Sequence, residues 1–466
     1  MPIFSAIIVL YVLYCFFMKS ATNAYYSLLT ISIFIELIYP QGNFLGNKTG
    51  IGLGYRNVSL IIIFIGSLLY LTRNKFFVNK KILYSSAFFI GVVLIGIILS
   101  YIMPYDGYII HTPEGWDLFL SGRNSMIKAD IPLASNIKNI VLLGLFIFNV
   151  TIFKSLIDKE KLTQILDKIV KYLYFIILYG VIEFLIKYVF RMPDLMISLN
   201  SALFGVAENT VTYSLTRGDM LGLQGVTSEP SHYVGSLFLI IVLFSICDKI
   251  HPRKKYNLLI FISFIFMVLS GSFSSILYLI VALYYCFYLY YGQYKNKWAK
   301  LCKNILIDTL VFFMLLFSLY MVLNITNSYY LERLENALVV INSIADSNLV
   351  GNIGTGESSW GRLLSLYYGF NIFYQNPLFG IGLEYQSVYD LTINILCNTG
   401  ILGLISYFMV ISSGYKEKTD RFAIFLLVII GGVFNSFVAK PYEVIIVVLS
   451  AFTMLYCNND KRNIYD

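Results

Sequence analysis

Residues 217–232 are the first stretch whose side chains could carry chemistry. Arg217, Glu229 and His232 gather there, directly before a long apolar run. Pro230 suits the first position of a helix, so these groups are expected where a loop turns into an apolar helix. Partial burial there would raise the pKa of Glu229 and make it a proton acceptor. The structural alternative is that Glu229 caps the helix or pairs with Arg217, and that His232 only packs.

A second stretch combines an arginine, several glycines and a polar run. It consists of Glu357-Ser-Ser-Trp-Gly-Arg362, Asn376-Pro-Leu-Phe-Gly-Ile-Gly-Leu383 and Asn398-Thr-Gly-Ile-Leu-Gly403. Ser358 and Ser359 can cap a helix that begins near Trp360 or Arg362. Proline disfavours helix in the residue before it, so Asn376–Pro377 is expected to end that helix.

The composition shows what must position these residues. Of the 466 residues, 58% are hydrophobic and 13% are charged, whereas a soluble domain carries about 25% charged residues. The apolar residues are spread from end to end, with a mean hydropathy of +0.74. This pattern excludes a soluble enzyme with one membrane anchor and predicts an all-α polytopic membrane protein.

Apolar runs long enough to cross a membrane as helices recur along the whole chain and predict about 12–13 transmembrane helices. They lie near 3–18, 24–39, 58–72, 82–103, 137–153, 171–190, 230–248, 256–270, 274–291, 304–325, 393–413, 422–437 and 443–457.

The predicted organisation has three parts. Residues 1–325 form transmembrane helices with outer loops near 104–136 and 191–229, and residues 393–466 form the C-terminal transmembrane helices. Between them, residues 326–392 form a large outer loop. Helical spacing of apolar residues over 330–346, followed by the helix near Arg362, predicts that this loop folds as a helical hairpin over the bundle.

Charge gives the loops a sidedness. Of the 34 basic residues, 23 fall in alternate loops, which places those loops in the cytoplasm. Six of the ten arginines lie on the opposite, outer side, against this trend. Arginine offers a planar fork of donors suited to phosphate, so the bias favours recognition of an anionic substrate. Chance and ordinary salt bridges are the alternative.

Taken together, these motifs resemble the O-antigen polymerase and ligase superfamily of bacterial membrane glycosyltransferases, and within it the Wzy-type polymerases. The resemblance rests on about 217–235, which includes Ser-Glu-Pro-Ser, and on 357–405. The latter holds the arginine-led outer helix, the Pro-Leu-x-Gly-x-Gly turn, a polar re-entry stretch and the Gly-Ile-Leu-Gly helix start. The span count and the large late outer loop agree, and the resemblance implies a GT-C-like fold.

Two departures from the family pattern bear on function. Ligases and many relatives carry a His-Asn pair shortly before the Gly-Ile-Leu-Gly helix, and the corresponding positions here are Tyr389 and Asp390. The missing histidine argues for a polymerase or a changed base. In addition, Gln224 stands where the family often has its earlier arginine, so that Arg217 is the nearest candidate.

The resemblance implies that polyprenyl-diphosphate-linked glycans are joined at the outer face of the bacterial inner membrane. A diphosphate leaving group needs its charge balanced. No DxD carboxylate pair occurs in the sequence, so we expect no metal cofactor and assign this role to arginines. Arg362 is the first candidate and Arg217 the second, with Arg191 and Arg123 behind them.

The acceptor hydroxyl needs a base, for which Glu229, Asp390 and His232 are the candidates in that order. Tyr389 and Trp360 could stack on sugar faces, although an aromatic residue in such a chain more often packs or lies in the membrane belt. The expected partners are the glycan donor and acceptor and the lipid bilayer. A chain-length regulator protein could also bind, and no nucleic-acid partner is expected.

Two other functions stay open. A ligase would transfer finished glycan to a lipid core. A glycolipid transporter would explain Glu36, Glu183 and Glu443, which lie in or at the ends of spans, because intramembrane carboxylates suggest ion pathways. However, transporters commonly show internal repeats, and none is apparent here.

Overall fold

The computed structural model is built from helices, as the composition predicts. It describes residues 1–38, 44–45, 54–74, 80–110, 127–128, 133–156, 159–205, 222–225, 227, 230–250, 254–270, 278 and 358–413. Its helices are α1 (Ile3–Met18), α2 (Ala21–Ile38), α3 (Tyr55–Arg73), α4 (Lys80–Ile102), α6 (Leu133–Leu156), α7 (Lys159–Phe184) with the π-turn η2 (Leu185–Val189), α8 (Pro193–Phe204), α10 (Pro230–Ile250), α11 (Lys254–Leu269), α15 (Ser358–Gln375) and α16 (Leu391–Ser412).

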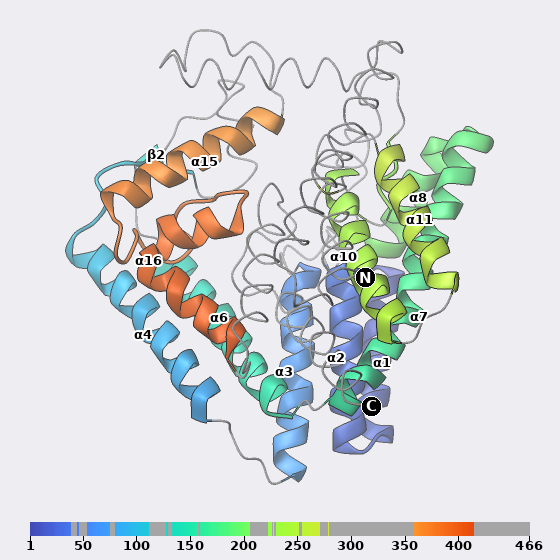
Figure 1. The fold of residues 1–466 in the computed structure, drawn as a ribbon, viewed down its shortest axis with the longest axis horizontal. Coiled ribbons are helices and arrows are strands. Elements are labelled where there is room, and N and C mark those ends of the chain that lie inside the picture. The colour runs from blue at the N-terminus through green and yellow to red at the C-terminus, as the bar shows by residue number, and fades with distance from the viewer. Residues whose placement is uncertain are drawn as a thin grey trace, which may run out of the picture.

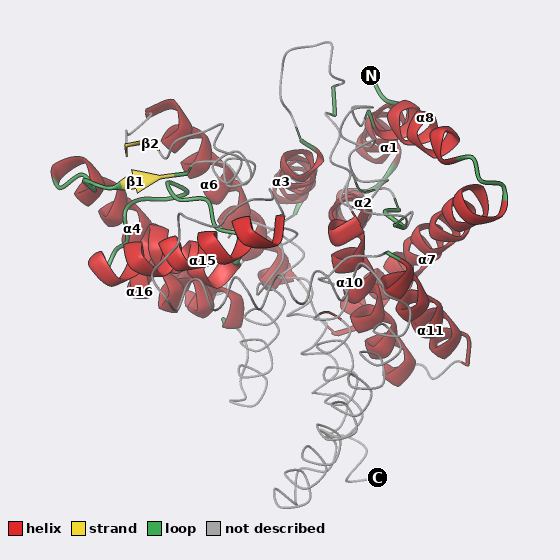
Figure 2. Cartoon of the chain, turned by 90° about the horizontal axis from the view of Figure 1, so that it is seen from above, coloured by secondary structure: helices red, strands yellow, loops and turns green. Residues whose placement is uncertain are grey.

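The described helices form two groups that α3 connects. One group contains α4, α6, α15 and α16, and the other contains α1, α2, α7, α8, α10 and α11 (Figure 1). Helix α3 packs on α2 on one side and on α6 on the other. The view from above also places α3 between the two groups (Figure 2).

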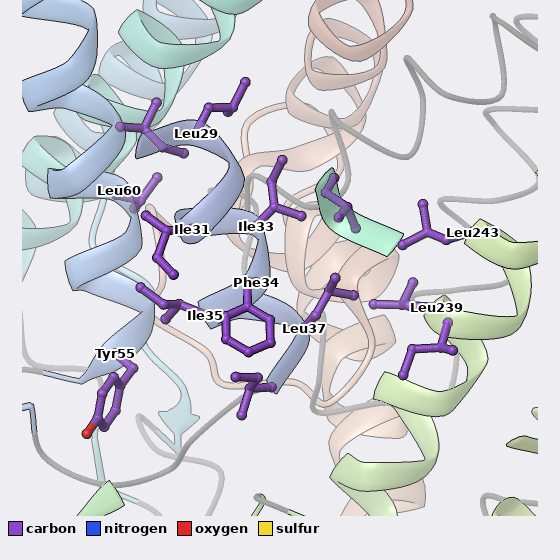
Figure 3. Close-up of a cluster of buried hydrophobic side chains, with 14 of the residues drawn as sticks. Leu29, Ile31, Ile33, Phe34, Ile35, Leu37, Tyr55, Leu60, Leu239 and Leu243 are labelled. Atoms are coloured by element: carbon purple, nitrogen blue, oxygen red, sulfur yellow. The ribbon is translucent and has the colours of Figure 1, made fainter. Parts of the chain in front are cut away.

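Helix α2 is the centre of one hydrophobic core. Every residue from Ala24 to Ile38 is buried, because a helix that is apolar around its whole circumference needs neighbours on all sides. Figure 3 shows Leu29, Ile33 and Leu37 among the side chains of this core, with α3 on one flank and α10 on the other. The core therefore ties the first helices of the chain to those that follow residue 230.

Several of the described helices have the length and composition that a membrane span requires. Five of those described are long and apolar enough to cross a membrane, and four shorter apolar helices accompany them. All nine predicted spans that fall on described residues are helical. The spans predicted near 274–291, 304–325, 422–437 and 443–457, and the amphipathic helix at 330–346, lie outside the described residues.

The predicted outer segments contain more regular structure than the sequence indicates. Helix α8 lies within 191–229, and a two-residue antiparallel ladder joins β1 (Tyr108–Ile109) to β2 (Ile127–Lys128) within 104–136. Helix α15 begins at Ser358, two to four residues before the predicted start near Trp360 or Arg362, and ends at Gln375 as Asn376–Pro377 predicts. It lies over the start of α16 (Figures 1 and 2).

Helix α16 is broken at Gly400. The backbone there has φ 69° and ψ −174°, a conformation that is essentially restricted to glycine. The polar stretch before Gly400 is therefore a half-helix of its own, and the predicted Gly-Ile-Leu-Gly helix start is the beginning of a second half-helix.

The Pro-Leu-Phe-Gly-Ile-Gly segment fills the break. The amides of Ile381 and Gly382 donate to the carbonyls of Cys397 and Asn398, at 3.1 and 2.9 Å. In the other direction, the amide of Ile401 donates to the Pro377 carbonyl at 2.8 Å. A break in an apolar helix leaves buried backbone groups unpaired, and this segment supplies their partners.

Lys154 closes the far end of the same helix. Its ammonium donates to the carbonyls of Val410 and Ile411, at 2.7 and 2.5 Å, and to Ser413. These are final-turn carbonyls, which have no partner within the helix. Helix α16 is thus fixed against α6 at one end and against the 377–382 segment at its middle.

Replacing Gly400 by alanine tests the importance of the break. A Cβ at this position would lie 2.2 Å from the carbonyl carbon and oxygen of Leu378, and the backbone conformation would itself cost on the order of 1–3 kcal/mol. We expect Gly400→Ala to lower the melting temperature of the detergent-solubilised protein by several degrees. The control is Gly91→Ala in α4, where a Cβ meets nothing within 4 Å. Equal melting of Gly400→Ala and the wild type would contradict the role of the break.

Candidate functional site

Asp390 begins α16 and is the best-defined of the candidate bases. Its Oδ1 accepts a hydrogen bond from the amide of Ile393 at 2.8 Å, which makes it the N-cap of the helix. Its side chain is buried, with 3% of the residue exposed. Its Oδ2 is also buried and has no hydrogen-bond partner among the described residues. One carboxylate oxygen thus holds the helix, while the other is buried without a hydrogen-bond partner among the described residues.

Burial changes the acidity of this carboxyl group. It raises the pKa of Asp390 from 3.8 to about 6, although hydrogen bonds from the amides of Ile393 and Thr392 oppose the shift. At neutral pH the group is still largely ionised, and its conjugate acid is weaker than that of an exposed aspartate. These two properties are what a general base requires near pH 7.

Two buried asparagine side chains follow Asp390 along the first half of α16. Asn394 and Asn398 follow at intervals of four residues, so all three share one helix face. The Asn398 amide nitrogen donates to Asn394 Oδ1 at 2.7 Å and to the Gln386 carbonyl at 2.8 Å. In return, the backbone amide of Gln386 donates to Asn398 Oδ1 at 2.8 Å. The loop before Asp390 is therefore fixed to the helix after it.

The same loop is tied to the outer segment after α4. The backbone amide of Ser387 donates to the Ile110 carbonyl at 2.7 Å, and the Ile110 amide donates to Gln386 Oε1 at 3.1 Å. Two segments far apart in the sequence, both predicted to lie on the outer side, thus meet at one end of the molecule. Their contact limits the freedom of the chain on the N-terminal side of Asp390.

Helix α15 brings the predicted diphosphate-binding arginine to this region. The Tyr389 amide donates to Ser365 Oγ at 3.4 Å, and Gly369 lies close to Ile393 and Val388. Arg362 and Trp360 are in the first turns of α15. The side chains of Trp360 and Arg362 lie outside the part of the chain that the structure describes. Tyr389 itself is buried.

The first predicted stretch lies elsewhere. His232 is buried in the first turn of α10, and the principal contacts of α10 within the described part of the chain are to α2, α7 and α11. Figures 1 and 2 place α10 in the group of helices away from α15 and α16. Pro230 is the first residue of α10, as its sequence position predicts.

Of the remaining predicted site residues, Arg191 belongs to the described part of the chain. Arg191 is exposed and follows the π-turn with a φ of 55°. Arg123, Arg217 and Glu229 lie outside the described residues. The described part of the chain therefore brings Tyr389 and Asp390 together with the helix that carries Arg362, and it does not bring His232 to them.

Sequence reasoning missed one polar cluster. Glu183 and Lys187 form an ion pair with an Nζ–Oε1 distance of 2.5 Å, and both side chains are fully buried. The signal was their spacing of four residues, which places two side chains on one helix face. Because Glu183 has this partner, it is not the isolated intramembrane carboxylate that an ion pathway would suggest.

The described residues of this region suit the transfer of a group to a hydroxyl. A carboxylate with one oxygen unpaired among the described residues can accept a proton, and a low-dielectric environment strengthens its interaction with any charge that develops nearby. The loop contacts fix the position of the carboxylate, so little reorganisation is needed at the moment of reaction.

Comparison with known proteins gives one family match. Residues 258–408, about a third of the chain, match the family described as O-Antigen ligase. The matched range contains Arg362 and Asp390 but not residues 217–232. No curated protein matches the chain. Over this range the chain is similar to O-antigen ligases, and the match supports a membrane protein of the O-antigen ligase or polymerase type without distinguishing the two.

Proposed function

We propose that the chain is a polymerase that joins polyprenyl-diphosphate-linked oligosaccharide repeat units into a surface polysaccharide, an O-antigen or a capsule. The reaction would take place at the outer face of the bacterial inner membrane. The observation that carries the proposal is the contact of α15, the helix of Arg362, with Tyr389, the residue directly before the buried Asp390 cap of α16. This contact lies inside the range that matches the family.

In the proposed reaction, an acceptor sugar hydroxyl attacks the anomeric carbon of the donor glycan. The hydroxyl proton passes to Oδ2 of Asp390 and the new glycosidic bond forms. The bond between the anomeric carbon and the diphosphate oxygen breaks, and the polyprenyl diphosphate leaves. Arg362 balances the charge on the departing diphosphate, with Arg217 as a second donor. The proton on Asp390 is then released to water.

A ligase is the second candidate, and the match to the O-Antigen ligase family favours it. Against it stands Tyr389, at the position where ligases of this superfamily carry their histidine. Both reactions use the same donor chemistry and differ in the acceptor, which is another lipid-linked glycan for a polymerase and a lipid core for a ligase.

Deletion of the gene in its host separates these functions. Loss of a polymerase leaves a lipid core that carries a single repeat unit, and loss of a ligase leaves a core that carries none. We expect the first pattern when surface glycans are separated on a gel. Long chains with normal surface display in the deletion strain would contradict both candidates.

Arg362→Ala tests the charge-balancing role. We expect a loss of about 100-fold or more in the rate of chain growth, the magnitude typical of removing one electrostatic donor in a transition state. Arg362→Lys keeps the charge but loses the fork of donors, so it should restore only part of the rate. The matched control is Asn371→Ala, an exposed position on the same helix. Normal chain length in a stably expressed Arg362→Ala strain would reject the assignment.

Asp390→Asn tests the base, because asparagine caps a helix as well as aspartate does but accepts no proton near pH 7. We expect an unchanged melting temperature and a rate that falls about 100-fold or more. In the wild type the base is active when ionised, so the rate should rise with pH through the pKa of about 6 and then level off.

This rise should disappear in Asp390→Asn and persist in Asp194→Asn, an exposed control in α8. A rise of the same midpoint in Asp390→Asn would show that another group is the base.

A further inference from the structure

Lys19 lies in the short turn between α1 and α2, and its side chain runs back over these helices. The ammonium lies 5.3 Å from the ring centroid of Tyr11 and 5.5 Å from that of Tyr14 in α1. It also donates to Ser27 Oγ of α2 at 2.7 Å. A lysine at the edge of a membrane commonly extends its charge away from the apolar region. The orientation of Lys19 therefore calls for a group that attracts its charge to this place.

The turn that contains Lys19 lies at the end of the helices opposite to α8. The beginning of α1 is fixed near α8, because Ser5 Oγ and the Tyr55 hydroxyl lie 2.8 Å apart and Tyr55 donates to the Phe204 carbonyl at 3.1 Å. Helix α1 has 16 residues, so its last residue is about 24 Å further along. Because α8 belongs to a predicted outer segment, the Lys19 turn lies at the predicted cytoplasmic end.

Helix α7 brings two more lysines to this place. Lys168 and Lys171 are three residues apart on α7 and are therefore neighbours on its surface. The charges of Lys19 and Lys171 both act on Lys168. The ring of Tyr172 stacks on Phe34 of α2 with 4.6 Å between the centroids, which fixes this part of α7 against α2. Three ammonium groups from two segments of the chain are thus gathered in one cluster.

The lysine cluster has no carboxylate partner within the described part of the chain. Lys168 and Lys171 are exposed and form no ion pair with a described residue, and the hydrogen bond of Lys19 goes to a neutral hydroxyl. Asp167 precedes Lys168 but makes no ion pair with it. Like charges on neighbouring positions repel one another. The cluster would therefore be stabilised by an anion from outside the chain.

The length of α7 places the cluster at the edge of the hydrocarbon region. Helix α7 and the π-turn that continues it have 26 and 5 residues, which together measure about 46 Å. The hydrocarbon core of a bilayer is only about 30 Å thick. The span predicted from the sequence begins at residue 171, so that Lys168 lies outside the hydrocarbon core and Lys171 at its edge. The anions at this depth are the phosphates of phospholipids.

The last turn of α1 offers an apolar surface beside the cluster. Phe16, Phe17 and Met18 have exposed fractions of 40%, 73% and 73%. Tyr14, one of the two rings that contact Lys19, is also exposed. Exposed apolar side chains at a membrane edge suit acyl chains, and tyrosine is common at the level of the headgroups. A ligand with a phosphate and an acyl chain fits both parts of this surface.

We propose that Lys19, Lys168 and Lys171 bind the phosphate of an anionic phospholipid in the leaflet at the predicted cytoplasmic face. Basic pockets between helices on this side of a membrane are typical sites for anionic lipid headgroups. The bound phosphate would neutralise the repulsion within the cluster and join the α1–α2 turn to α7. This site is separate from that of α15 and α16, and the inference is independent of the proposed function.

Thermal unfolding of the full-length protein with added lipid tests the proposal. The protein is purified in a neutral detergent, and either phosphatidylglycerol or phosphatidylcholine is added. A ligand that binds the folded state raises the melting temperature. We expect phosphatidylglycerol to raise it by several degrees more than phosphatidylcholine does. Equal effects of the two lipids on the wild type would overturn the proposal.

The double variant Lys19→Gln/Lys168→Gln should lose most of the difference between the two lipids. Arg73→Gln/Lys80→Gln is the matched control, because it removes the same charge from two exposed residues that are also predicted to lie at the cytoplasmic end. We expect the control to keep the difference seen in the wild type. If the control loses as much as the double variant, general surface charge accounts for the lipid effect and the proposal is wrong.

Inorganic phosphate added with phosphatidylcholine separates a lipid headgroup from a free anion. We expect no rise in the melting temperature, because the free anion lacks the acyl chains that hold the headgroup at the cluster. A rise as large as that with phosphatidylglycerol would overturn the assignment to a lipid.

Lys168→Gln alone decides the question if the double variant fails to fold, because Lys168 is exposed and its replacement leaves the contacts of Lys19 in place. Native mass spectrometry then compares the phosphatidylglycerol retained by the two proteins. We expect less lipid on Lys168→Gln than on the wild type. Equal retention would overturn the proposal.

Discussion

Buried backbone groups must find hydrogen-bond partners within an apolar protein, and this requirement determines where the molecule can depart from a helix. The structure meets it at two non-helical segments by different means. At the break in α16, the 377–382 segment exchanges backbone hydrogen bonds with both half-helices around Gly400. At the 222–225 loop, the charged side chains of Glu183 and Lys187 supply the partners. Each solution pairs buried backbone groups of an irregular segment.

Both irregular segments lie beside residues that could carry chemistry. The first leads into Asp390, and the second leads into the Ser-Glu-Pro-Ser-His segment. A charged or catalytic group on a flexible loop would have to be ordered at each turnover, at a cost in free energy. Here the cost is met during folding, and the low dielectric around Asp390 raises its pKa at the same time. The fixed position of Asp390 and its raised pKa therefore have a common origin in burial.

The sequence was informative where a signal extends over many residues or depends on one strong local rule. Apolar runs predicted the described spans, Pro230 predicted the start of α10, and Asn376–Pro377 predicted the end of α15. The break at Gly400 was not predicted as an interruption within one helix, because apolar periodicity does not register a single residue. The β1–β2 ladder was too short to produce an alternating pattern.

The candidate site, too, was only partly predictable from sequence patterns. Asp390 was identified from its place before the Gly-Ile-Leu-Gly motif, but its role as a helix cap depends on where α16 begins. The spacing of Glu183 and Lys187, four residues, is evident in the sequence. Their common hydrogen-bond partner, the 222–225 loop, lies many residues later in the chain. Contacts of this kind depend on tertiary packing, which no local pattern contains.

The central claim is that this chain elongates lipid-linked glycans at the site formed by α15 and α16. Its most direct test is a reconstitution of the purified protein in proteoliposomes with the lipid-linked repeat unit as both donor and acceptor, followed by mass spectrometry of the products. The account predicts a ladder of products that differ by one repeat unit. If the folded protein leaves single repeat units unchanged, and instead transfers glycan only when a lipid core is added, the polymerase assignment is wrong.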